Sequence, residues 1–326
     1  MQGVRGMTVG VAGLPGSLEV VCEGLGFPEG PIALPDGSVL LVEIARGVLI
    51  NVSPAGRRTV VADLGGGPNG AAIGPDGAVY VCNNGGFTWH TEPGHIRVSG
   101  QAEDYSGGRI ERVDLAAGRS EVLYRQCNGR SLRGPNDLVF DRQGGFYFTD
   151  HGKIRERDLD RGAVCYATAD GNHIEEVIFP VSLPNGIALS PDESVLYVTE
   201  TETGRLWRYR LLAPGRPEIL PYPSPNGGEL VFGAGGFQRF DGMKVEADGR
   251  ISVATLQNGG ITTVDPRDGF ATHVPMPGRH TTNLCFAGPD LTTLYVTLSS
   301  TGRLVRVPWP RPGHRLNFIE QAGRHA

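Results

Sequence analysis

The stretch Leu183–Glu200, LPNGIALSPDESVLYVTE, decides the fold. It places a polar residue, Asn185, directly ahead of a short apolar run, and a turn follows with Asp192 seven residues after Asn185. A second apolar run, VLYVTE, comes after the turn. Runs of this kind on either side of a Ser-Pro-Asp turn predict two antiparallel strands joined as a hairpin.

The same unit occurs five more times along the chain. Each copy has a polar residue at the position of Asn185, a turn seven residues later, and a second apolar run after the turn. The polar residues are Glu29 in FPEGPIALPDG, Asn69 in PNGAAIGPDG, Asn136 in PNDLVFDRQG, Asp241 in FDGMKVEADG and Asn283 in TTNLCFAGPD. Successive positions are 40, 67, 49, 56 and 42 residues apart. This period is typical of β-propeller blades, so we expect an all-β, six-bladed β-propeller.

The strand count predicts how the ring of blades closes. The last repeat supplies three strands, whereas SLEVVCEGL, residues 17–25, precedes the first repeat and has no blade of its own. We therefore expect this N-terminal strand to complete the last blade, which removes two exposed sheet edges. Residues 17–308 then form a single domain, with residues 1–16 as an N-terminal extension and residues 309–326 as a peripheral C-terminal tail.

The repeat also predicts a site. The innermost strands of a propeller start at the same end of the central channel, so the six polar residues form a ring of oxygen donors there. Such donors suit a divalent cation such as calcium. Asn-Gly and Asp-Gly are also common turn dipeptides, but Glu29 is a poor turn former and all six positions share one register. We expect Glu29, Asn136, Asn185 and Asp241 to share a metal or substrate site, and Asn69 and Asn283 to line the channel.

The longest interval contains an insertion at residues 83–108, which follows the second strand of its blade and therefore belongs on the face with the ring. Its aromatic residues, Phe87 and Trp89 above all, form either a lid over a substrate or an ordinary hairpin. His90 and His95 lack metal-ligand spacing.

Two further residues are expected at the same face. His151 ends a second strand and is a candidate base or hydrogen-bond donor, although a surface histidine is the alternative. Arg133, three residues before Asn136, is a candidate contact for a substrate oxygen. The charged stretch KIRERDLDRG that follows His151 is interpreted as a solvated loop.

Composition excludes several classes of protein. With 30 basic and 35 acidic residues the net charge is -5, a balance that does not indicate a nucleic-acid-binding protein. The five cysteines are scattered and odd in number, as expected of reduced thiols. The chain contains neither an apolar run of membrane-spanning length nor a signal-like N-terminus, so we expect a cytoplasmic protein that contacts no membrane. Neither a Gly-x-Ser-x-Gly elbow nor a phosphate-binding loop is present.

These motifs resemble the SMP-30, gluconolactonase and luciferin-regenerating-enzyme-like family of six-bladed propellers, to which diisopropylfluorophosphatase is related. The resemblance covers nearly the whole chain. It implies one divalent cation held by Glu29 of FPEGP, Asn136 of GPNDLVFD, Asn185 of LPNGIALSPD and Asp241 of FDGMKVEADG. Arg133 lies three residues before Asn136 where family lactonases often have an arginine two residues before it. Many members of the family have Thr-Asp-Pro where this chain has Thr149-Asp150-His151. The resemblance therefore does not imply sugar recognition of the gluconolactonase kind.

The expected function is divalent-metal-dependent hydrolysis of a small-molecule lactone or related ester. The metal would polarise the carbonyl, and the catalytic residue Asp241 would orient or deprotonate the attacking water. Direct attack by Asp241 stays open, as does the choice among calcium, zinc, manganese, magnesium and iron(II). The alternatives are a phosphotriesterase-like metal hydrolase and a non-catalytic propeller that binds calcium or partners. The sequence does not indicate an oligomeric state.

Overall fold

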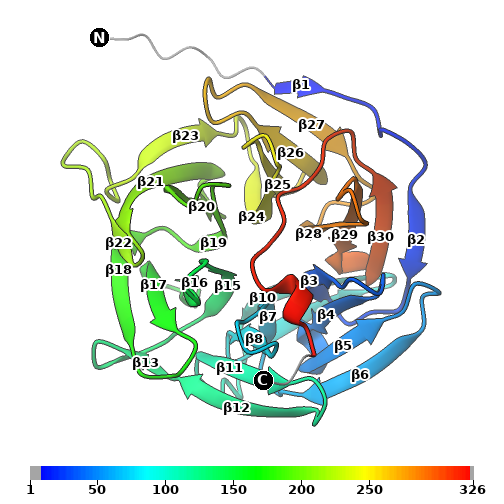
Figure 1. Ribbon diagram of the computed structural model, residues 1–326, viewed down its shortest axis with the longest axis horizontal. Helices are drawn as coiled ribbons and strands as arrows, with labels where there is room; N and C mark the ends of the chain where they lie inside the picture. The colour runs from blue at the N-terminus through cyan, green and yellow to red at the C-terminus, as the bar shows by residue number, and fades with distance from the viewer. Residues whose placement is uncertain (1–8, 324–326) are drawn as a thin grey trace.

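The computed structural model describes residues 9–323 and folds them into six antiparallel sheets around a central axis (Figure 1). The prediction of an all-β, six-bladed propeller is confirmed. From the channel outward, the first three blades are β3 (Pro28–Ala33), β4 (Val39–Glu43), β5 (Val48–Val52) and β6 (Arg58–Asp63); β7 (Pro68–Ile73), β8 (Val79–Asn83), β11 (Arg109–Asp114) and β12 (Arg119–Tyr124); and β15 (Pro135–Phe140), β16 (Gly145–Asp150), β17 (Gly162–Thr168) and β18 (Ile174–Val181).

The remaining blades follow the same order. They are β19 (Pro184–Leu189), β20 (Val195–Glu200), β21 (Arg205–Ala213) and β23 (Glu229–Gly233), with β22 (Arg216–Pro217) paired to the end of β21; β24 (Arg239–Val245), β25 (Ile251–Leu256), β26 (Gly260–Val264) and β27 (Ala271–Pro275); and β28 (Thr281–Ala287), β29 (Thr293–Leu298) and β30 (Arg303–Pro308). Outside the blades are the hairpins β9 (Phe87–Glu92) with β10 (His95–Gln101) and β13 (Gln126–Cys127) with β14 (Arg130–Ser131), and the 3-10 helices η1 (Ile44–Arg46), η2 (Ser299–Thr301) and η3 (Ile319–Gln321).

The ring closes as the strand count predicts. β2 (Glu19–Cys22) is the outer strand of the sixth blade, where Val20 pairs with Val305 of β30. A shorter strand, β1 (Val9–Val11), adds a parallel fifth strand to the fifth blade by pairing with β27. Residues 1–8 of the expected N-terminal extension lie outside the described residues. Closure therefore joins the start of the described chain to the last two blades.

Local chemistry explains the repeated turns. In the first two repeats the Asp of the Pro-Asp-Gly turn accepts a backbone hydrogen bond from two residues further on, Ser38 N to Asp36 Oδ1 at 2.9 Å and Ala78 N to Asp76 Oδ1 at 3.2 Å. The glycine that follows Asp36 has φ of 84°, a conformation that favours glycine. These turns fix the register of each inner hairpin.

The Asn-Gly dipeptides have a different role. A Cβ atom on Gly70 would lie 2.5 Å from the carbonyl oxygen of Asn136, and one on Gly186 would lie 2.7 Å from that of Asp241. Both contacts are closer than a side chain tolerates, so glycine allows the inner strands of neighbouring blades to approach. The ring residues are thereby drawn together around the axis.

Apolar side chains fill the space between the blades. Tyr80 of the second blade packs edge-on against Phe140 of the third, with ring centroids 5.0 Å apart, inside one buried cluster. Inner strands such as β15 and β19 are buried along their whole length, which explains their uninterrupted apolar sequences. The five cysteines are free thiols, as predicted.

Residues 309–323 of the expected C-terminal tail lie mostly on the surface and contact the blades. After β30 the chain runs across the end of the channel opposite the ring, as the red segment in Figure 1 shows. There Asn317 donates to the carbonyl oxygen of Phe140 at 3.0 Å and to Glu193 at 2.7 Å. A cavity of about 800 Å³, lined by all six inner strands, lies between this segment and the blades.

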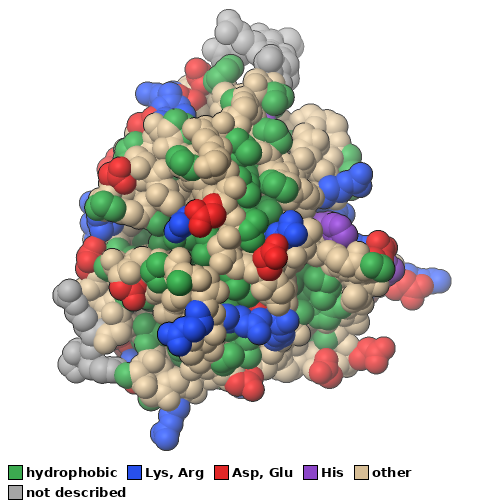
Figure 2. Space-filling model, turned by 90° about the vertical axis from the view of Figure 1, so that its right-hand side faces the viewer, with side chains coloured by type: hydrophobic (Ala, Val, Ile, Leu, Met, Phe, Trp, Pro, Cys, Tyr) green, Lys and Arg blue, Asp and Glu red, His purple; other side chains and the backbone are tan. Residues whose placement is uncertain are grey.

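The surface in Figure 2 carries basic and acidic side chains interspersed with apolar ones. Among the described residues no helix is long and apolar enough to cross a membrane.

Candidate active site

The inner strands bring the predicted ring together at one mouth of the channel. The side chains of Glu29, Asn69, Asn136 and Asn185 are all at least nine-tenths buried at the starts of β3, β7, β15 and β19. Asp241 lies at the equivalent place in β24. Five blades therefore supply the residues that their sequence register predicts.

The sixth blade is shifted by one residue. Asn283 donates its backbone N–H to the hydroxyl of Thr297 at 2.9 Å, as Asp137 does to Thr149 at 3.1 Å. Asn283 is thus equivalent to Asp137, one residue deeper than the ring, and Thr282 occupies the ring position. The irregular register between Thr281 and Asn283 accounts for the shift.

Asp137 and Asn283 form a second layer below the ring. In the other four blades this position holds glycine: Gly30, Gly70, Gly186 and Gly242. A Cβ atom on Gly242 would lie 2.3 Å from Cγ of Asn283, so Asn283 fills the space that this glycine leaves. From there Asn283 Nδ2 donates to Oε2 of Glu29 at 2.9 Å.

The two carboxylates of the ring lie together at the mouth, with Glu29 buried and Asp241 partly buried. Burial raises the pKa of Glu29 to about 7, although its hydrogen bonds from Gly30 N and Asn283 act in the opposite direction. Burial also raises the pKa of Asp241, and the charges of Glu29 and Asp137 raise it further. Within residues 9–323 neither Glu29 nor Asp241 forms an ion pair. Buried carboxylates without a cation are strongly unfavourable.

A lysine that the repeat does not reveal lies beneath the ring. Lys244 Nζ is 3.9 Å from Oδ2 of Asp137 and donates to the carbonyl oxygen of Met243 at 3.0 Å. Lys244 lines the cavity on the far side of the second layer. Its charge therefore faces Asp137 and leaves the two ring carboxylates without a cationic partner.

These residues fit a divalent cation. In the described part of the chain no three His, Cys, Asp or Glu side chains cluster as metal ligands, so a cation here would be held by two carboxylates and by amide oxygens. The side chains of Asn69 and Asn136 make no hydrogen bond with any residue in the range 9–323. All-oxygen donors of this kind suit calcium, magnesium or manganese better than metals that prefer sulfur or imidazole.

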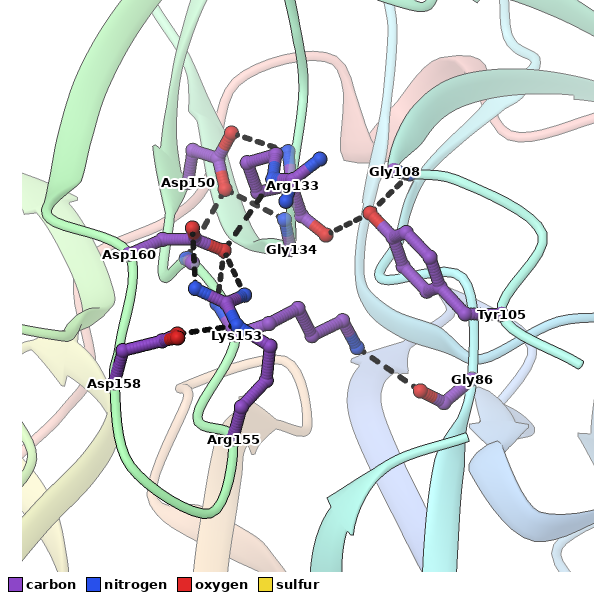
Figure 3. A network of polar contacts seen from close by, with 11 residues as sticks. Gly86, Tyr105, Gly108, Arg133, Gly134, Asp150, Lys153, Arg155, Asp158 and Asp160 are labelled. Carbon is purple, nitrogen blue, oxygen red and sulfur yellow. Dashed lines mark hydrogen bonds and ion pairs between the residues drawn. The ribbon is translucent and has the colours of Figure 1, made fainter. Parts of the chain in front are cut away.

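Asp150 shapes the loop that leads into β15. Its carboxylate accepts hydrogen bonds from the backbone N–H groups of Arg133 at 2.8 Å and Gly134 at 2.6 Å (Figure 3). It also accepts one from the backbone N–H of Gly152 at 3.1 Å. The guanidinium of Arg133 lies 3.3 Å from Asp160. Asp150 thus orders the backbone just before Asn136, while Arg133 is held on the rim.

His151 carries a neutral, partly buried imidazole. Nδ1 lies 3.0 Å from the carbonyl oxygen of Pro184, so Nδ1 carries the proton and Nε2 is an acceptor. Burial lowers the pKa of His151 to about 4, and the nearby Lys153 contributes in the same direction. The side chain links the third blade to the residue preceding Asn185.

The insertion lies at the mouth that holds the ring. Trp89 packs against Phe27, two residues before Glu29, with ring centroids 5.1 Å apart. On the other side Tyr105 donates to the carbonyl oxygen of Arg133 at 2.6 Å (Figure 3). The segment therefore spans from the first blade to the third. His90 is on the exposed part of the hairpin, 2.8 Å from Glu92.

Comparison with known proteins identifies the family. The model of the SMP-30/Gluconolactonase/LRE-like region matches residues 27–300. The chain belongs to this family. Among SMP-30/gluconolactonase relatives, lactonase drp35 of Staphylococcus epidermidis is 30% identical over 259 residues, which cover 79% of this chain and 70% of that protein. A gluconolactonase of Zymomonas mobilis is 28% identical over 315 residues, which cover 89% of this chain and 80% of that protein.

Solved structures share the fold. A gluconolactonase from Xanthomonas campestris superposes with a TM-score of 0.70 at 21% identity, covering 94% of this chain and 99% of that one. The calcium-binding protein regucalcin from Agrobacterium tumefaciens gives a TM-score of 0.70 at 21% identity, and the superposition covers 95% of this chain and 100% of that one. At these identities the likeness establishes the propeller alone.

Proposed function

We propose that this protein is a divalent-metal-dependent hydrolase that opens a lactone, either a sugar lactone or a related cyclic ester. The observation that carries the proposal is the pair of carboxylates of Glu29, which is buried, and Asp241, which is partly buried; both lie among amide side chains at a channel mouth, and neither is paired with a cation in the described chain. The lactonase and gluconolactonase names of the relatives support the reaction, and the calcium-binding name of regucalcin supports the metal.

Glu29, Asn136, Asn185 and Asp241 are the proposed ligands of one divalent ion, which we take to be calcium because every donor is oxygen. When bound, such an ion supplies Lewis acidity toward the lactone carbonyl. Asp241 is the proposed catalytic residue: its carboxylate orients the attacking water and takes its proton. Attack by Asp241 on the carbonyl carbon is the alternative. A single turnover in ¹⁸O-labelled water tests this alternative, because label enters Asp241 only if an acyl-Asp241 anhydride forms and water then cleaves it at the carboxyl carbon of Asp241.

The residues around the ligands are proposed to contact the substrate. Asn69 has an amide that no described residue engages, and neutral His151 offers Nε2 as an acceptor for a substrate hydroxyl. Phe87 and Trp89 contribute apolar surface at the mouth. The proposed substrate contacts are Asn69, Phe87, Trp89, Arg133 and His151. Asn283, which the sequence also suggests, lies below the ring and acts on the site through its hydrogen bond to Glu29.

The proposal is tested with aldonolactones, aliphatic lactones and phosphotriesters, using wild type, Asp241→Asn and the matched control Asp290→Asn. Asp290 is an exposed turn residue whose side chain bonds only Thr292 among the described residues, and asparagine preserves such turns. We expect wild type and Asp290→Asn to open lactones, and Asp241→Asn to lose at least about 100-fold in kcat/KM. Hydrolysis of phosphotriesters alone would favour the phosphotriesterase alternative. Calcium binding without any hydrolysis would favour a non-catalytic propeller.

A further inference from the structure

The chain is unusual in its basic residues. Of its 30 Lys and Arg residues only two, Lys153 and Lys244, are lysines. Lys244 lies below the ring, whereas Lys153 lies in the loop after β16 and is 1% exposed. Lys153 is fully buried and Lys244 partly buried, whereas the described arginines, apart from the buried Arg109, are all at least partly exposed. This makes the contacts of Lys153 informative.

Within residues 9–323, the hydrogen bonds and ring contacts of Lys153 Nζ are all to the insertion. Lys153 Nζ donates to Oδ1 of Asn84 and to the carbonyl oxygen of Gly86, each at 3.0 Å. It also lies over the rings of Phe87 at 4.1 Å and Tyr105 at 5.3 Å. Figure 3 shows the side chain reaching from its own loop to Gly86. The third blade is thereby attached to the point where the β9–β10 hairpin leaves the second blade.

The backbone at this point has little conformational restraint of its own. Gly85 and Gly86 have φ values of 82° and 115°, in the region that only glycine adopts readily. Asn84 Oδ1 accepts a hydrogen bond from Gly86 N at 2.9 Å in addition to that from Lys153. One amide oxygen therefore closes the bend and receives the ammonium group.

Packing alone does not explain a lysine here. Burial lowers the pKa of Lys153 to about 7, so an ammonium group at this place is unfavourable. Methionine fills a similar volume and would contact Phe87 without that cost. What methionine cannot do is donate to Asn84 and Gly86, which fixes the direction in which the hairpin leaves the blade.

We propose that Lys153 is a positioning residue that fastens the root of the β9–β10 hairpin to the third blade and so keeps Phe87 and Trp89 over the mouth of the channel. Substrate binding then depends on Lys153 although it does not touch the metal ligands. The kinetic part of this inference rests on the proposed lactone hydrolysis, whereas the structural part does not.

The structural part is tested by hydrogen–deuterium exchange of residues 84–102 in metal-loaded wild type and in Lys153→Met. We expect exchange in this segment to become about tenfold faster or more, with the inner strands unchanged. Arg155→Met is the matched control, because Arg155 lies in the same loop but bonds only Asp158 and Asp160. Unchanged exchange in Lys153→Met, or equal loss in Arg155→Met, would overturn the inference.

The kinetic part uses the same variants with a bulky lactone. We expect Lys153→Met to raise KM about tenfold with kcat and calcium affinity little changed, and Lys153→Arg to recover part of the loss. A fall in kcat with constant KM would contradict a positioning role. Should Lys153→Met not fold, Asn84→Ala removes the same bond from the other side. If no variant, including wild type, hydrolyses lactones, the exchange result still decides the role of Lys153.

Discussion

Asn283 donates a hydrogen bond from Nδ2 to Oε2 of Glu29 at 2.9 Å, across 254 residues of sequence. The bond joins the sixth blade to the first, so closure of the ring also orients the carboxylate of Glu29. Asp241 lies on the fifth blade, and the charge of Glu29 raises the pKa of Asp241. The proposed metal site thus depends on the assembled propeller and on no single blade.

Removing either ring carboxylate is expected to weaken metal binding. Glu29→Gln and Asp241→Asn each take one negative charge and one strong donor from a site with two, so calcium affinity should fall at least about 100-fold. The fold should persist, because apolar strands supply the core. Isothermal titration with calcium measures the affinity, and Asp290→Asn serves as the surface control. Wild-type affinity in both ring variants would show that the ion binds elsewhere.

Trp89 is expected to contribute to substrate affinity. Its ring packs on Phe27 at the edge of the mouth, so Trp89→Ala removes apolar surface from both the hairpin and its contact with the first blade. We expect KM for bulky lactones to rise about tenfold with calcium content unchanged. Steady-state kinetics with small and bulky lactones provides the measurement. If Trp89→Ala and wild type had equal kinetics with all substrates, the hairpin would have no role in substrate binding.

Lys153 is expected to titrate near neutral pH. Burial lowers its pKa from the ordinary 10.5 to about 7, although Asp150 and Asp160 raise it; Asn84, Gly86, Phe87 and Tyr105 are its other neighbours. Between about pH 7 and pH 10 the unfolded chain holds this proton and the folded chain does not. This group therefore makes the free energy of unfolding rise with pH in that range, and Lys153→Met removes the contribution.

Labelling with [¹³Cε]lysine checks this directly, because the chain gives only two lysine signals and Lys153→Arg assigns them. A midpoint near pH 7 for the Lys153 signal is expected. Midpoints above pH 10 for both signals would contradict the prediction.

Much of the fold can be predicted from the sequence because each blade repeats the same local chemistry. Asp36 and Asp76 close their turns with bonds two residues away, and the apolar runs around them alternate with such turns along the whole chain. The unpaired strand at residues 17–25 leaves one place for closure. These features depend on neighbours in sequence, so their spacing predicts five of the six ring positions.

Other features depend on contacts between distant segments. The irregular pairing at the start of β28 moves Asn283 one residue below the ring, and spacing does not reveal it. Lys153 stands in a charged stretch that indicates a solvated loop, yet the insertion 67 residues away buries it. The C-terminal segment lacks a strand pattern, although it binds Phe140 and Glu193 at the far end of the channel.

The most direct test of the central claim, that the metal acts in lactone opening and does not only stabilise the fold, measures activity and circular dichroism together during chelation and re-addition of metal. We expect chelation to abolish hydrolysis while the β-sheet spectrum persists. Re-added calcium, magnesium, manganese, zinc and iron(II) should restore different turnover numbers, because their Lewis acidity and preferred geometry differ. Full lactonase activity in folded, metal-free protein would contradict the account. The same turnover number per folded molecule with every added cation would also contradict it.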